Sequence, residues 1–184
     1  MIAYIPNILT VARIVLTAIA IVLVPFSLAG IYFYLFFIFV VAALTDFADG
    51  YLARKFAVES DFGKMFDPLS DKVLTFVFLI LLYGTGLIPH VIILLLIVRD
   101  LAVDGVRNAF AARVVVPAIM NAKIKTTLIF LLIISALFEL AFYTSAAIHL
   151  LTLTLALLAL VFSYISAVQY AQIFYRVHQR EKNQ

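Results

Sequence analysis

The sequence contains no cysteine and no tryptophan, and only 12% of its 184 residues are charged. Without cysteine, the chain can form neither disulfides nor thiolate-based sites. It also has no glycine-rich phosphate loop and no serine–histidine arrangement, which disfavours a kinase or a phosphatase of the soluble type. A soluble domain of this length would need far more polar residues to cover its core, so the scarcity of charge disfavours a soluble protein.

Apolar residues make up 66% of the chain, and the mean hydropathy is +1.19. They form six runs whose lengths are close to the roughly 20 residues that a helix needs to cross a bilayer. We therefore predict an all-α integral membrane protein, a single domain over residues 1–184, with six transmembrane helices. The expected helices cover about residues 8–24, 31–52, 66–83, 91–110, 124–142 and 148–174.

The basic residues are distributed unevenly over the connections between these runs. Lys and Arg are absent from the first, third and fifth connections, but they occur in the second and fourth connections and in the C-terminal tail. Because positively charged segments tend to stay on the cytoplasmic side, we expect both termini and the even-numbered connections to face the cytoplasm. In a bacterium, the membrane would be the inner or plasma membrane.

Four aspartates interrupt the apolar pattern near the cytoplasmic ends of the second and third runs. Asp46 and Asp49 are three residues apart, and Asp67 and Asp71 are four apart, so each pair lies on one face of its helix. A charged group inside a spanning segment costs roughly 2.5–3.5 kcal/mol on insertion scales, and such groups are functional candidates. The two helices are expected to bring all four carboxylates to one membrane depth.

Four neighbouring carboxylates would repel each other strongly unless cations neutralised them. Oxygen ligands without Cys or His favour Mg²⁺, Mn²⁺ or Ca²⁺ over zinc. Two such ions can clamp both sides of a phosphoryl displacement. The alternative is that the aspartates are helix-end charges paired with Arg54, Lys64 and Lys72.

The spacing of this segment also carries a family resemblance. Eight residue identities over residues 46–71 match the signature of the CDP-alcohol phosphotransferases, which this chain resembles. The resemblance implies six transmembrane helices around a polar cavity open to the cytoplasm, a CDP-linked donor and two divalent ions, Mg²⁺ or Mn²⁺. It also implies direct in-line displacement, with Asp46, Asp49 and Asp67 as metal ligands and with Asp71 as metal ligand and general base. The matching pattern is Asp46-x2-Asp49-Gly50-x2-Ala53-Arg54-x8-Gly63-x3-Asp67-x3-Asp71.

The donor site is expected to include the first helix. Asn7, Thr10 and Arg13 form a polar stripe there, and the family often carries a similar pattern. Alternatively, Asn7 caps the helix and Arg13 pairs with one of the aspartates. The residues predicted to bind the CDP moiety are Asn7, Thr10, Arg13, Asp49, Gly50, Ala53, Arg54 and Gly63.

A basic cluster in the second half suits an acceptor that itself carries phosphate. It consists of Arg99, Arg107, Lys123 and Lys125, and Thr126 is expected to bind the acceptor's phosphate with them. The competing interpretation is that these residues bind lipid headgroups or only orient the protein in the membrane. Further matches, among them Arg99-Asp100 and Lys123-x-Lys125-Thr126-Thr127, resemble the subgroup that uses glycerol 3-phosphate as its acceptor. That resemblance implies transfer of the phosphatidyl group of CDP-diacylglycerol to glycerol 3-phosphate, with inositol phosphate and phosphatidylglycerol (as in cardiolipin synthesis) as alternative acceptors.

Other partners and functions follow from the same observations. The family precedent implies a homodimer within membrane lipid, and no nucleic-acid partner is expected. An ion-binding transporter is the alternative of another class, but its acids would be spread along a path across the bilayer. Glu139 lies deep in the fifth apolar run and is assigned no function, and His149 is interpreted as an ordinary interfacial residue.

Overall fold

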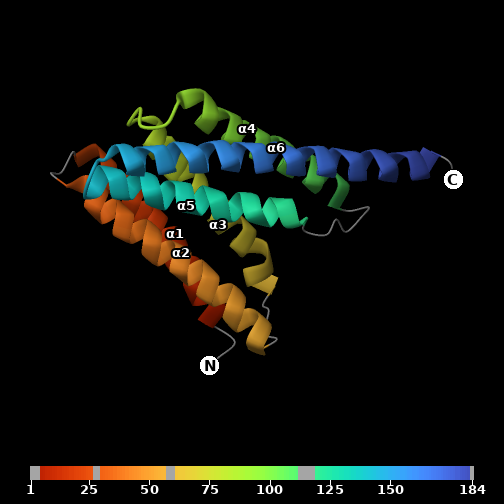
Figure 1. Cartoon of the computed structure of the whole chain (residues 1–184). Coiled ribbons are helices and arrows are strands. Elements are labelled where there is room, and N and C mark those ends of the chain that lie inside the picture. Colours follow the sequence, from red (N-terminus) through yellow and green to blue (C-terminus); the bar gives the residue numbers. More distant parts are fainter. Residues whose placement is uncertain (1–4, 27–29, 57–60, 112–118, 183–184) are drawn as a thin grey trace.

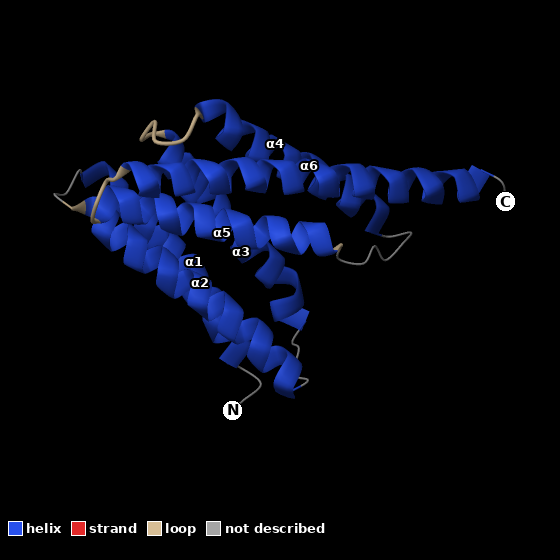
Figure 2. Ribbon diagram, in the orientation of Figure 1, coloured by secondary structure: helices blue, strands red, loops and turns tan. Residues whose placement is uncertain are grey.

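The computed structural model describes residues 5–26, 30–56, 61–111 and 119–182, and all regular structure in these ranges is helical (Figure 2). This confirms the predicted all-helical fold with six long helices in the expected order. The elements are α1 (Ile5–Leu23), the short 3-10 helix η2 (Val24–Phe26), α2 (Ile31–Phe56), α3 (Asp61–Tyr83), α4 (His90–Ala111), α5 (Met120–Ala141) and α6 (Ala146–Lys182).

The helix ends lie further out than the apolar runs predicted. Helix α5 begins at Met120 rather than near residue 124, and α6 continues to Lys182 rather than ending near residue 174. An apolar run marks the part of a helix that suits hydrocarbon, whereas polar residues can continue the same helix beyond it. Lys123 and Lys125 therefore lie inside α5, and their directions are fixed by the helix.

The core lies where α2, α3 and α5 meet. The ring of Phe39 on α2 is 4.8 Å from that of Phe78 on α3 and 5.5 Å from that of Phe130 on α5, both in edge-to-face geometry. Helix α1 packs against α2 and α3, while α6 packs along α5 and against α4 (Figure 1). This packing leaves α3, α4, α5 and α6 around one side of the molecule, where the polar residues gather.

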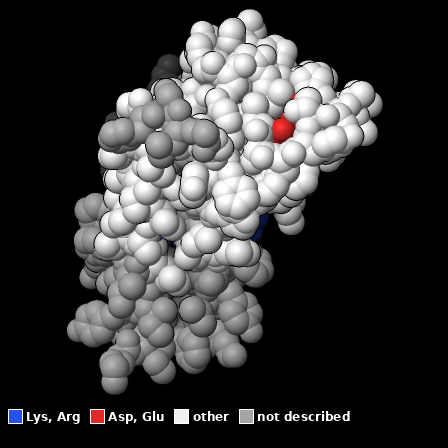
Figure 3. Space-filling view, turned by 90° about the vertical axis from the view of Figure 1, so that its left-hand side faces the viewer, with Lys and Arg blue, Asp and Glu red and all other residues white. Residues whose placement is uncertain are grey.

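Two of the described helices are long and apolar enough to cross a membrane, Met120–Ala141 and Ala146–Arg176. Large apolar side chains on α6, including Val161, Ile165 and Val168, are exposed on the surface of the chain. The third and fifth connections, which lack Lys and Arg, lie at the same end of the molecule as the end of η2 and the start of α2 (Figure 1). The described surface seen from that end carries very little charge (Figure 3).

Candidate active site

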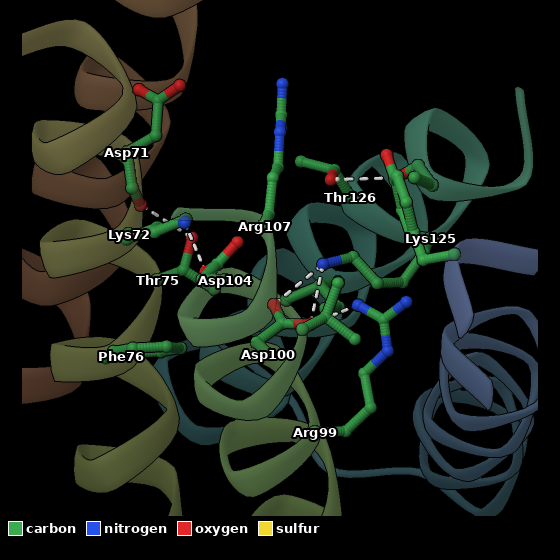
Figure 4. Close-up of a pocket in the computed structure, with 14 residues that line it drawn as sticks. Asp71, Lys72, Thr75, Phe76, Arg99, Asp100, Asp104, Arg107, Lys125 and Thr126 are labelled. Carbon is green, nitrogen blue, oxygen red and sulfur yellow. Dashed lines mark hydrogen bonds and ion pairs between the residues drawn. The ribbon is translucent and has the colours of Figure 1, made fainter. Parts of the chain in front are cut away.

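Four helices line a polar cavity of about 240 Å³ (Figure 4). Four cationic and three anionic side chains contribute to its lining, so the described lining has a net charge of +1. The polar lining comes from Asp71, Lys72 and Thr75 of α3, Arg99, Asp100, Asp104 and Arg107 of α4, Lys125 and Thr126 of α5, and Tyr170 of α6.

Asp71 is held at this cavity by Arg13 of α1. The guanidinium of Arg13 is fully buried; its Nη1 donates to Ser70 Oγ at 2.9 Å and forms an ion pair with Asp71 Oδ1. The Asp71 side chain is about one-third exposed. A buried guanidinium needs an anionic partner, and the structure supplies the aspartate that the sequence analysis offered as an alternative. Arg13 therefore fixes the direction of a carboxylate that remains accessible from the cavity.

The other predicted metal ligands are placed by the bounds of their helices, and their side chains lie outside the described part. Asp46 and Asp49 are ten and seven residues before the end of α2, while Asp67 and Asp71 are six and ten residues after the start of α3. With a rise of about 1.5 Å per residue, the two helices carry acids at matching distances from their short connection. Among the residues that could be searched, no three acidic or histidine side chains form a metal-binding group.

Asp100 joins the inner wall of the cavity to two neighbouring helices. Its Oδ1 accepts hydrogen bonds from Arg99 Nη1 at 2.8 Å and from Lys125 Nζ at 2.9 Å. Lys125 Nζ also donates to Asp100 Oδ2 at 2.7 Å, and Arg99 Nη2 donates to Ser166 Oγ of α6 at 2.5 Å. These side chains are nearly buried, so α4, α5 and α6 share a polar network behind the cavity.

The outer part of the cavity is more exposed. Lys72 of α3 forms an ion pair with Asp104 of α4 (Figure 4). Arg107 is exposed and extends along the cavity, and it has no hydrogen-bond or ion-pair partner among the described residues. Thr126 Oγ donates to the backbone carbonyl of Ala122 at 3.1 Å. A guanidinium that lines a cavity in this way is suited to bind an anion.

The structure brings together only part of the predicted acceptor cluster. Arg99, Arg107, Lys125 and Thr126 all line the cavity, whereas Lys123 is exposed and does not. Two residues along a helix turn the side chain by about 200°, so Lys123 and Lys125 point to different sides of α5.

The predicted donor residues are described less completely. Thr10 and Arg13 are buried on α1. The side chains of Asn7, Asp49, Gly50, Ala53, Arg54 and Gly63 lie outside the described part of the chain.

The sequence analysis missed three partners in these networks. Ser70 and Ser166 each accept a hydrogen bond from a buried arginine, and Asp104 pairs with Lys72. The signal for Ser70 was its position beside Asp71. Ser166 gave no comparable signal, because 67 residues separate it from Arg99.

Comparison with known proteins identifies the family of this chain. A family model described as CDP-alcohol phosphatidyltransferase matches residues 3–169. The chain is similar to a CDP-diacylglycerol–glycerol-3-phosphate 3-phosphatidyltransferase of Rickettsia typhi, with 41% identity over 126 residues, 67% of this chain and 70% of that protein. It is also similar to a Bacillus subtilis protein of the same name, with 39% identity over 139 residues, 66% of this chain and 69% of that protein. The chain therefore belongs to the CDP-alcohol phosphatidyltransferase family.

Proposed function

We propose that this chain transfers the phosphatidyl group of CDP-diacylglycerol to glycerol 3-phosphate, producing phosphatidylglycerol phosphate and CMP. The observation that carries the proposal is that one cavity combines the accessible carboxylate of Asp71 with cationic side chains from two other helices. The names of the relatives in Rickettsia typhi and Bacillus subtilis point to the same reaction.

The proposed chemistry is a single in-line displacement. A hydroxyl oxygen of the acceptor attacks the phosphorus that carries the diacylglycerol, and a new oxygen–phosphorus bond forms. The bond from that phosphorus to the oxygen of CMP breaks, and CMP leaves with the electron pair. Asp71 accepts the proton of the attacking hydroxyl, and Arg13 keeps its carboxylate in position for this transfer.

Divalent ions fit the acidic residues of α2 and α3. Asp46, Asp49, Asp67 and Asp71 would hold two ions, Mg²⁺ or Mn²⁺, which would neutralise the negative charge of the diphosphate. The nature of these four candidate ligands supports the assignment, because all are carboxylates and they lie at matching distances along two connected helices.

We assign the contacts with the CDP moiety of the substrate to the helices around Asp71. Asn7 and Thr10 lie on α1, Asp49, Gly50, Ala53 and Arg54 on α2, and Gly63 on α3. We propose that these residues contact the CDP moiety, and that Arg13 contributes mainly through Asp71. Support comes from the packing of α1 against both α2 and α3.

The phosphate of the acceptor is assigned to the cationic part of the cavity. Arg107 is exposed there, and Lys125 has an ammonium with three donors of which Asp100 engages two. Thr126 lies one residue further along α5 and lines the same cavity. We propose that these three residues bind the phosphate while the hydroxyl to be activated approaches Asp71.

We further propose that all six helices span the cell membrane, with both termini and the cavity on the cytoplasmic side. Support comes from the third and fifth connections, which lack Lys and Arg and lie at one end, and from the weak charge of the described surface there (Figures 1 and 3). The proposal that two copies form a homodimer depends on family precedent alone.

The function can be tested with purified protein in mixed micelles of detergent and CDP-diacylglycerol. Labelled glycerol 3-phosphate, inositol phosphate, serine and phosphatidylglycerol would be compared as acceptors, with Mg²⁺, with Mn²⁺ and with a chelator. The proposal predicts CMP release and labelled lipid with glycerol 3-phosphate, and their loss on chelation. Turnover only with another acceptor would replace the substrate, and the absence of CMP release with all of them would favour the ion-binding alternative.

A further inference from the structure

Arg99 lines the cavity but is poorly placed to bind a phosphate. Its side chain is only 6% exposed, and both terminal nitrogens already donate hydrogen bonds, Nη1 to Asp100 and Nη2 to Ser166. A guanidinium has five N–H donors, and Arg99 Nε has no hydrogen-bond partner among the described atoms, so it is the burial of the side chain, and not a lack of donors, that disfavours direct binding of a phosphate. The contacts of Arg99 therefore point away from the ligand and towards the protein.

The contacts of Asp100 lead from Arg99 to Lys125. Asp100 Oδ1 receives hydrogen bonds from both cations, and Oδ2 receives a second one from Lys125. A lysine ammonium on a flexible stem loses conformational freedom when a ligand fixes it. Because Asp100 fixes the ammonium of Lys125 through two contacts, most of that loss has occurred before an anion arrives.

Ser166 anchors the far end of this chain of contacts. Its hydroxyl donates to the backbone carbonyl of Ser163 at 2.9 Å, which leaves the oxygen to accept from Arg99 Nη2. Ser166 is fully buried, and it belongs to α6, which also packs against α4. The direction of Arg99 is thus set by a helix that contributes no charged group to the cavity lining.

We propose that Arg99, Asp100 and Ser166 are positioning residues that hold the ammonium of Lys125 at the cavity, where Lys125 binds the acceptor's phosphate directly together with Arg107 and Thr126. This inference rests on the proposed function for the identity of the acceptor. It reassigns Arg99, which the sequence analysis counted among the phosphate ligands, and adds Ser166 from a helix with no predicted site residue.

A pair of buried serines on α6 provides a matched test. Ser163 and Ser166 are one helical turn apart and both are fully buried, but Ser163 Oγ has no hydrogen-bond partner among the described atoms. We expect Ser166→Ala to raise the KM for glycerol 3-phosphate about fivefold, because Arg99 loses one of its two anchors. Ser163→Ala should leave this KM unchanged, and neither substitution should change kcat or the KM for CDP-diacylglycerol by more than about twofold.

Substitutions of Asp100 test the sign of the effect. Asp100→Asn makes the cavity more positive. If the Asp100 carboxylate only repelled the phosphate, this substitution would lower the KM for glycerol 3-phosphate. Positioning predicts the opposite, a rise of about tenfold, with partial recovery in Asp100→Glu, which restores the charge. Thermal unfolding of each purified variant would show whether a raised KM reflects lost folding instead.

Two results would overturn the inference: a lower KM in Asp100→Asn, or equal KM values in the two serine variants. Failure of the proposed function is recognised separately, because the wild-type protein would then not use glycerol 3-phosphate. In that case the same variants would be compared with whichever acceptor the wild type uses. If it uses none, equilibrium binding of inorganic phosphate would be measured, and equal affinities of wild type and Ser166→Ala would overturn the inference.

Discussion

Helix α5 carries a buried charged residue near each of its ends, and the two sites differ in what surrounds them. Lys125 is near the start of α5 and Glu139 is fourteen residues later, about 21 Å along the helix. Lys125 lines the polar cavity together with charged groups from α3 and α4. Glu139 lies at the other end of the hairpin formed by α5 and α6, and it is not part of that lining.

The carboxylate of Glu139 is satisfied by polar groups of α6. His149 Nδ1 lies 3.1 Å from its Oε1, and Thr152 Oγ donates to its Oε2 at 3.2 Å. The Thr152 hydroxyl also lies 2.8 Å from Ser135 Oγ. These contacts join α5 to α6 and leave the Glu139 side chain only 1% exposed. A buried charge with such partners ties two helices together, whereas one beside a cavity can also contact a ligand.

The largest difference in turnover between the cavity and the region of Glu139 is expected when one carboxylate in each is replaced by the amide of the same shape. Asp71→Asn should lower kcat about 1,000-fold, because the amide cannot accept the proton of the attacking hydroxyl. Glu139→Gln, the matched substitution in the other region, should keep nearly wild-type turnover. Steady-state release of CMP measures both variants, and an equal loss in both would mean that Asp71 has only a structural role.

A smaller effect is expected from Arg13→Lys. Lysine keeps the positive charge, but it lacks the planar guanidinium through which Arg13 contacts both Ser70 and Asp71. We expect kcat to fall about tenfold with little change in either KM, because the direction of the Asp71 carboxylate is no longer fixed. Thr17→Val is the control: it removes only a hydrogen bond to the Arg13 backbone carbonyl, and unchanged kinetics are expected.

The smallest effect on turnover is expected from Glu139→Ala. The substitution leaves Thr152 and His149 without their shared acceptor and should destabilise the fold by about 1–3 kcal/mol. The KM for glycerol 3-phosphate and the turnover of the folded fraction should not change. Thermal unfolding together with the acceptor titration measures both quantities, and a raised KM would show that the two ends of α5 are coupled.

The sequence predicted the fold well, because apolar runs of bilayer length indicate helices directly. It also predicted that Arg99, Arg107, Lys125 and Thr126 act together, and the structure places all four around one cavity. The composition of the apolar run alone could not show which of the two lysines, Lys123 or Lys125, faces the cavity. The answer depends on the start of α5 and on its rotation against the other helices, which tertiary packing determines.

The pairing of charges was less predictable than their presence. Arg13 had several acidic residues as potential partners, and only the packing of α1 against α3 selected Asp71. No sequence pattern distinguishes Ser166 and Thr152 from the other small polar residues of α6, yet each is a partner of a buried charge. Contacts between helices that are distant in the sequence depend on the relative rotation of the helices, which no local pattern encodes.

The central claim is that the cavity between α3, α4 and α5 binds the phosphate of the acceptor. The most direct measurement compares the KM for glycerol 3-phosphate in Lys125→Met and Lys123→Met, because the two lysines are neighbours on one helix and only Lys125 lines the cavity. We predict a rise of about 10- to 100-fold for Lys125→Met. For Lys123→Met we predict a change below about twofold. Equal KM values in the two variants, with both proteins folded, would contradict this account.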